Sequence, residues 1–156
     1  MKARPLMRPR PRRDRGLATI EFAICVPVLL LLMLGTAEIG RLLFQYNTLT
    51  KAVRDGARYA ASNAATTGTR IVNLSAQRRT ETINLIRTGN IAGSGTPLLP
   101  GALQVDIIEN DATGFIRITG QYTFTPILGG TLPTFGLGQP IDLNMTLPAT
   151  VVMRAL

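Results

Sequence analysis

The sequence predicts an α+β protein in which one long N-terminal helix packs on a small C-terminal antiparallel sheet of about three strands. An apolar stretch from Leu17 to Ile39 continues into apolar residues spaced three and four positions apart, up to about Ala65. This spacing is typical of one amphipathic helix. From Leu103 onward apolar and polar residues alternate instead, as they do in half-buried strands. At 156 residues the chain has room for about one domain.

The apolar part of the helix, residues 17–37, is predicted to cross a membrane. Its inner stretch, Phe22 to Ala37, carries no charge. At about 1.5 Å per residue, a helix over the whole apolar stretch spans roughly the hydrocarbon core of a bilayer. A basic leader, residues 1–16, precedes it, so the N-terminus is expected in the cytoplasm and the C-terminal part on the other side. Pro27 is tolerated in membrane helices and is predicted to kink this one.

The charge and the reactive side chains exclude several function classes. Seven basic residues and Asp14 precede Leu17, so the leader accounts for +6 of the formal net charge of +8. No aromatic residue stands among these arginines to stack on bases, and we therefore predict no nucleic-acid partner. The chain has no histidine, and Cys25 is its only cysteine. Without the commonest general base and the usual zinc ligands, we predict no enzyme, no cofactor and no metal.

Glu21 is the most informative residue of the membrane segment. A carboxylate at the centre of a membrane helix costs roughly 2.5 to 3.5 kcal/mol on insertion scales, and less near the interface, so it needs a use. Three interpretations compete for the segment. In the first, the segment is a secretory signal with a peptidase site at Gly35-Thr36-Ala37. In the second, it is an anchor that is not cleaved. In the third, a leader is cut off between Gly16 and Leu17, and the hydrophobic helix stays on the mature protein.

Two motifs resemble a known family. The segment RGLATIEF has a glycine followed by a glutamate as the fifth residue after it, which resembles the type IV prepilin pattern. The continuation AICVPVLLLLMLGTAEIGRLL, followed by AVRDGARYAA, resembles the TadE family of small pilin-like proteins of tight-adherence pili. The resemblance covers Arg13 to Ala61 closely. It implies a pilin-like architecture, whose long helix is transmembrane in its first half and periplasmic in its second.

The resemblance also implies residue roles and partners. Gly16 would be recognised by a prepilin peptidase, and Leu17, where many type IV pilins carry phenylalanine, would become the new N-terminus. Glu21 would meet the amino terminus of a neighbouring subunit, which offsets the desolvation of both groups. The chain continues far beyond its hydrophobic helix, so it resembles a minor pilin, or pseudopilin, that acts in assembly, initiation or at an adhesive tip.

Such a protein would lie in the bacterial inner membrane with its C-terminal domain in the periplasm, or outside the cell in the pilus. Its partners would be the prepilin peptidase, major and minor pilins, the inner-membrane assembly platform and membrane lipid. The alternative is a single-pass adaptor or binding protein that never enters a filament. A mature N-terminus at Leu17 favours assembly, Met1 an anchor and Glu38 a secreted protein.

The amphipathic extension of the helix, residues 38–65, carries the second motif. Small residues in Ala52 to Ala61 predict close packing, either against the protein's own C-terminal sheet or against another subunit. The candidate contact residues are Arg54, Gly56, Arg58 and Tyr59.

The remaining residues, 66–156, are predicted to form a small α+β domain. A polar stretch, Ser62 to Thr69, is predicted to be a loop. A second helix is predicted over about Val72 to Arg87, with Arg78, Arg79 and Glu81 exposed. After a long Gly- and Pro-rich connection, two alternating segments predict a hairpin in which Asn110 pairs with Phe115, Ile107 with Ile118, and Leu103 with Tyr122.

The end of the chain is predicted to complete the sheet. Pro126 ends the second strand, LGGTLPTFGLGQP forms a loop, and Leu143 to Met153 forms a third strand. Pro148 has no amide donor and is expected at an edge or a bulge. Carboxylates from Asp106 to Asp111 suggest a calcium site, but ENDATG is also typical of a simple turn.

Overall fold

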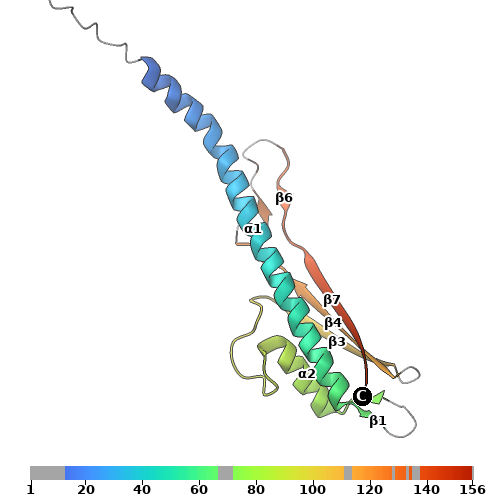
Figure 1. Ribbon diagram of the computed structural model, residues 1–156. Helices are drawn as coiled ribbons and strands as arrows, with labels where there is room; N and C mark the ends of the chain where they lie inside the picture. The colour runs from blue at the N-terminus through green and yellow to red at the C-terminus, as the bar shows by residue number, and fades with distance from the viewer. Residues whose placement is uncertain are drawn as a thin grey trace, which may run out of the picture.

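The structure, a computed structural model, describes residues 13–66, 72–110, 114–127, 129–132, 134 and 138–155. In chain order its elements are α1 (Arg13–Asn63), β1 (Ala65–Thr66), β2 (Val72–Asn73), α2 (Ala76–Thr88), β3 (Leu103–Asn110), β4 (Phe115–Thr123), β5 (Thr131–Leu132), β6 (Ile141–Asp142) and β7 (Thr146–Arg154). The N-terminal part of α1 extends alone, and the other elements gather along its C-terminal part (Figure 1). The predicted α+β arrangement is confirmed.

Helix α1 is one continuous helix of 51 residues with Pro27 inside it. It begins at Arg13, before Gly16, and ends two residues before the predicted Ala65. Its N-terminal part leaves large apolar side chains bare, as shown by Leu17 at 72% exposure and Met33 at 70%. The helix is long and apolar enough to cross a membrane, and its most apolar stretch is not buried inside the fold.

The main sheet has three antiparallel strands in the order β3-β4-β7. The predicted hairpin is confirmed in every stated pair: Asn110 lies opposite Phe115, Ile107 opposite Ile118, and Leu103 opposite Tyr122. Strand β7 is an edge strand in which Pro148 lies opposite Gln121, so the edge position predicted for this proline is also confirmed. The missing amide of Pro148 therefore leaves the sheet intact.

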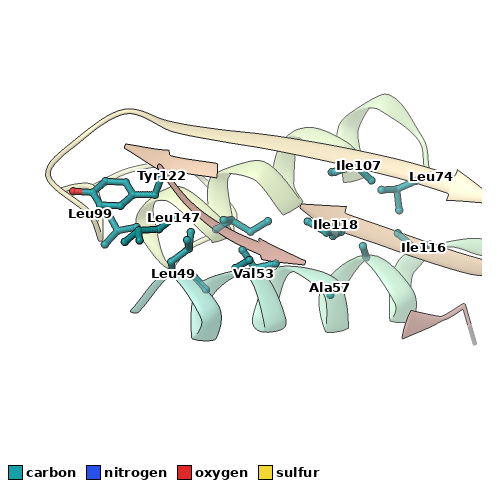
Figure 2. Packing of buried hydrophobic residues seen from close by; sticks show 14 of the residues in the cluster. Leu49, Val53, Ala57, Leu74, Leu99, Ile107, Ile116, Ile118, Tyr122 and Leu147 are labelled. Carbon is teal, nitrogen blue, oxygen red and sulfur yellow. The ribbon is translucent and has the colours of Figure 1, made fainter. Parts of the chain in front are cut away.

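The core lies between the C-terminal half of α1, the inner face of this sheet and α2 (Figure 2). Every second residue of strand β4 is buried, namely Ile116, Ile118, Gly120 and Tyr122. The residues that alternate with them are exposed, except for the half-buried Thr119. Gly120 brings helix and sheet into close approach, because a Cβ there would lie 2.7 Å from Cγ2 of Val53 and 3.2 Å from Cδ1 of Leu49. The central strand thus lacks a side chain where α1 crosses it.

Two predictions around α2 are wrong at their boundaries. Val72 and Asn73 form strand β2 instead of helix, and they pair with β1, which lies in the segment predicted to be a loop. The helix starts at Ala76 because Ser75 caps it, with Oγ accepting from the amide of Arg78 at 3.3 Å. Residues 67–71, which include the rest of the predicted loop, lie outside the described residues.

The final third also departs from prediction. Strand β7 starts at Thr146, not at Leu143, since Ile141 and Asp142 form β6, which pairs with β5, and residues 143–145 connect β6 to β7. The amide of Leu143 donates to the carbonyl oxygen of Gly130 at 2.8 Å, which extends the pairing of β5 with β6. The predicted loop therefore contains β5, one strand of the two-stranded β5–β6 sheet, and β5 contacts α1.

Candidate functional site

The predicted cleavage and assembly residues lie together on the free N-terminal part of α1. Gly16, Leu17 and Glu21 are all exposed. A Cβ added at Gly16 would meet no atom within 4 Å. Within the part of the chain that the structure describes, no ion pair involves Glu21. The fold therefore makes no visible use of either the glycine or the carboxylate.

Cys25 and Pro27 lie further along the same segment. Cys25 is a free, exposed thiol. Pro27 is half-buried and interior to the helix, where its missing amide removes one intrahelical hydrogen bond. The helix continues through Pro27, and the kink stays a prediction.

A polar cluster fastens the C-terminal domain to α1 at the end of the predicted membrane span. The buried carboxylate of Glu38 accepts a hydrogen bond from the backbone amide of Ile127 at 2.8 Å. Its other oxygen pairs with Nη1 of Arg41 at 3.3 Å. Nη2 of Arg41 donates to the carbonyl oxygen of Thr125 at 3.4 Å, and the guanidinium lies 5.7 Å from the ring centroid of Phe124. We call Glu38 and Arg41 the clasp.

Sequence reasoning missed the clasp and treated Glu38 only as the end of the span. The available signal was a glutamate three positions before an arginine at the edge of an apolar stretch. That spacing predicts an ion pair on a helix. The spacing gives no indication that Glu38 also accepts a hydrogen bond from the backbone of Ile127, which is distant in the sequence.

The small-residue face of α1 packs inside the protein. Ala52, Ala57 and Ala60 are buried in the core. Gly56 lies against α2, since a Cβ there would come within 2.6 Å of Cδ1 of Ile86 and within 3.6 Å of Cγ2 of Thr82. The face therefore contacts α2 as well as the sheet that the sequence led us to expect.

Tyr59 belongs to a polar cluster that ties α1 to α2. Its hydroxyl donates to Oε2 of Glu81 at 2.6 Å and accepts from Nη1 of Arg78 at 2.8 Å. Oε1 of Glu81 also accepts from Nε2 of Gln77 at 2.9 Å. The hydrogen bond from Tyr59, then that from Gln77, holds the pKa of Glu81 below its ordinary value. The same tyrosine, with Glu81, raises the pKa of Arg78.

The prediction that Arg78, Arg79 and Glu81 of α2 are exposed is wrong. Arg78, Arg79 and Glu81 are all partly buried. Nη2 of Arg79 pairs with Oε1 of Glu109 at 2.5 Å, and Nη1 donates to the carbonyl oxygen of Ile107 at 3.1 Å. These side chains face α1 and β3, because α2 packs between those elements.

Two further predictions remain open. Arg54 and Arg58 are exposed on α1, and their contact with another subunit stays a prediction. In the described ranges no three side chains of metal-ligating type lie close enough to hold an ion. Asp111, part of the suggested calcium site, lies outside the described residues.

These features define the class: an α+β protein with one long N-terminal helix, which is a candidate membrane anchor, and a small three-stranded sheet packed on that helix. The family follows from comparison, since residues 16–58 match the family described as TadE-like protein. This match confirms the resemblance for the helix and identifies the segment as TadE-like; it ends before α2 and the three-stranded sheet. No curated protein matches the chain, and no solved structure matches it either.

Proposed function

We propose that the chain is a minor pilin, or pseudopilin, of a tight-adherence type IV pilus, cut after Gly16 by a prepilin peptidase. The observation that carries this proposal is the TadE-like match, which starts at Gly16 and covers the exposed apolar helix. Lipid covers that helix before assembly, and the helices of other pilins cover it afterwards. No catalytic role is part of the proposal.

The environment of Gly16 supports a role in recognition. Glycine inside a helix costs about 1 kcal/mol relative to alanine. At Gly56 a tight contact with Ile86 accounts for that cost. Around Gly16 there is open space, and no positive φ demands a glycine. Packing therefore does not explain the glycine at position 16. A peptidase that accepts only a small residue before the scissile bond would explain it.

The exposure of Glu21 supports a role between subunits. An unpaired carboxylate within an apolar helix is costly. Cleavage after Gly16 creates a positive amine at Leu17, four residues before Glu21 on the same helix. The amine of one subunit then pairs with the Glu21 carboxylate of the next, which offsets the desolvation of both and sets the axial stagger between the two helices.

Beyond helix α1, the mature protein also carries a small folded domain. It packs along the part of α1 that follows the predicted membrane span, so it lies outside the bilayer when α1 is inserted (Figure 1). We therefore propose a role in assembly, initiation or tip adhesion, with the inner-membrane platform and other pilins as partners. A single-pass adaptor would instead keep Met1 and stay out of filaments.

The test is the mature N-terminus, together with two matched glycine variants. Gly16→Leu should leave the protein at full length, whereas wild-type protein starts at Leu17. Gly40→Leu is the control, because Gly40 is also helical and a Cβ there also meets nothing within 4 Å. The control should be cut normally. Cleavage of Gly16→Leu at the wild-type rate would reject the proposed site.

A further inference from the structure

The segment between the second and third strands of the main sheet is almost uncharged. From Arg117 to Arg154 the sequence carries one charged side chain between those two arginines, Asp142. The other charges that the structure describes in the C-terminal domain lie on α2 and the three-stranded sheet. We call residues 126–145 the apolar lobe, which the structure describes at 126–127, 129–132, 134 and 138–145.

The apolar lobe lies beside the membrane-spanning part of α1. A small cavity of about 120 Å³ is lined by Leu34, Ala37 and the clasp on one side and by Ile127 on the other. Leu34 and Ala37 fall inside the predicted span, residues 17–37. Strands β5 and β6 lie next to the middle of α1, further toward its N-terminal end than the three-stranded sheet (Figure 1). The lobe therefore reaches the depth at which α1 leaves the bilayer.

Its apolar side chains are turned outward at this depth. Ile127 is 73% exposed, Ile141 is 52% exposed, and Met145 is also exposed. Leaving such side chains in water forfeits about 25 cal/mol for each Å² of apolar surface that lipid would cover. Ile141 and Asp142 are neighbours on β6, so they point to opposite faces of the strand. The one charge of the lobe thus does not share a face with Ile141.

The clasp adapts the polar groups of this region to a membrane surface. Glu38 accepts a hydrogen bond from the backbone amide of Ile127, so this donor needs no water partner at the membrane interface. Arg41 carries the positive charge of the clasp and lies partly exposed, at the level where lipid head groups bind arginine. Asp142 accepts hydrogen bonds from the backbone and side-chain nitrogens of Asn144 at 2.8 and 3.0 Å.

We propose that the apolar lobe inserts into the interface of the leaflet on the domain's side, so that the protein binds lipid at two places. The inference rests on the proposed function, because it requires α1 to span the bilayer. The occupant is lipid because the exposed Ile127 lies beside Leu34 and Ala37 of the predicted span, and because Asp142 is the one charged residue in the sequence of the lobe. The lobe fixes how deep and at what tilt the helix lies before assembly.

The test compares two single-cysteine positions of nearly equal exposure. In a Cys25→Ser background, Ile141→Cys places an environment-sensitive fluorophore on the lobe, and Ile108→Cys places it on β3 of the main sheet. Ile141 is 52% exposed and Ile108 is 49% exposed. Full-length protein is reconstituted into vesicles of phosphatidylcholine and phosphatidylglycerol. Quenching by spin-labelled lipid is then compared with quenching by aqueous iodide present on both sides of the membrane.

The expected result is a blue-shifted emission at position 141, with most of the fluorescence lost to spin-labelled lipid and little to iodide. The probe at 108 should show the reverse. Ile127→Cys provides a second lobe position if Ile141→Cys does not fold, as judged by circular dichroism.

A third probe, on the native Cys25, distinguishes failure of lobe insertion from failure of α1 to span the membrane. If Cys25 is quenched by lipid while positions 141 and 127 behave like 108, the lobe is aqueous and the inference is overturned alone. If Cys25 itself is quenched by iodide, α1 does not span the membrane, and the proposed function fails with the inference.

Discussion

The contact between Gly56 of α1 and Ile86 of α2 predicts whether a glycine-to-alanine substitution in α1 stabilises or destabilises the fold. Gly56→Ala and Gly40→Ala are the same change in the same helix. At Gly40 the new methyl group meets nothing within 4 Å, so the gain in helix propensity stands alone. That gain is about 1 kcal/mol. Gly40→Ala should therefore stabilise the fold.

At Gly56 the same gain is opposed by overpacking. The new Cβ would lie 2.6 Å from Cδ1 of Ile86, well inside ordinary carbon contact, and Ile86 is fully buried and cannot swing into solvent. Overpacking of a core costs about 1 to 3 kcal/mol. Gly56→Ala should therefore range from neutral to about 2 kcal/mol destabilising, in contrast to Gly40→Ala.

A partner variant isolates the clash. Ile86→Ala removes Cγ1 and Cδ1 of Ile86, the two atoms that the new methyl group would approach most closely. Alone it should cost about 2 to 5 kcal/mol because of the cavity it leaves. In that background Gly56→Ala should become stabilising, since the clash is gone and the methyl group fills part of the cavity.

The measurement is thermal unfolding of the full chain in detergent micelles, followed by near-ultraviolet circular dichroism of the tyrosines. For a domain of this size, 1 kcal/mol corresponds to a Tm shift of about 4 to 8 °C. If Gly56→Ala raised Tm as much as Gly40→Ala, the close packing of α1 on α2 would be refuted.

Three further predictions follow from the polar residues. Glu21→Gln should be cleaved and inserted normally but should be scarce in sheared filaments, and normal incorporation would leave the charge without its proposed role. The lowered pKa of Glu81 means that its stabilising contribution is complete above the ordinary glutamate pKa of about 4.3 and is lost as pH falls through the lowered value. Tyr59→Phe removes the largest cause, so the Glu81 carboxylate should titrate at a higher pH by NMR; an unchanged titration curve would contradict this. Glu38→Ala deletes the acceptor for the amide of Ile127, whose hydrogen exchange should speed up by about tenfold to hundredfold, from roughly 1.5 to 3 kcal/mol for a bond to a charged group. Glu38→Gln retains an acceptor and should show a smaller effect.

Local patterns predicted the parts of the fold that local patterns control. The hairpin register followed from strict alternation and a turn-rich break, because a slip of one residue would turn Ile107 and Ile118 outward. The long helix followed from apolar spacing alone. The start of α2 did not, since Val72 and Leu74 fit a helical face as well as a strand, and the cap at Ser75 decides between the two.

Contacts between distant segments were the part that the sequence could not reveal. Glu81 belongs to the exposed face of an isolated helix, and only the arrival of Tyr59 from α1 makes it partly buried. The clasp likewise needs Ile127 to return to α1. Strands as short as β5 and β6 have no periodicity to detect. For the candidate site, a sequence motif predicted Gly16 and Glu21. The open space around Gly16, which shows that the fold does not need a glycine there, is visible only in the structure.

The unbroken course of α1 has a mechanical consequence. A helix that is continuous from Arg13 to Asn63 acts as a stiff rod, and its outer half is held to the sheet at Gly120 and to α2 at Gly56. Torque or traction applied to the bare end is therefore transmitted to the whole outer domain instead of being absorbed at a flexible joint. Machinery that extracts this helix from the bilayer would have to move the outer domain with it as one rigid body.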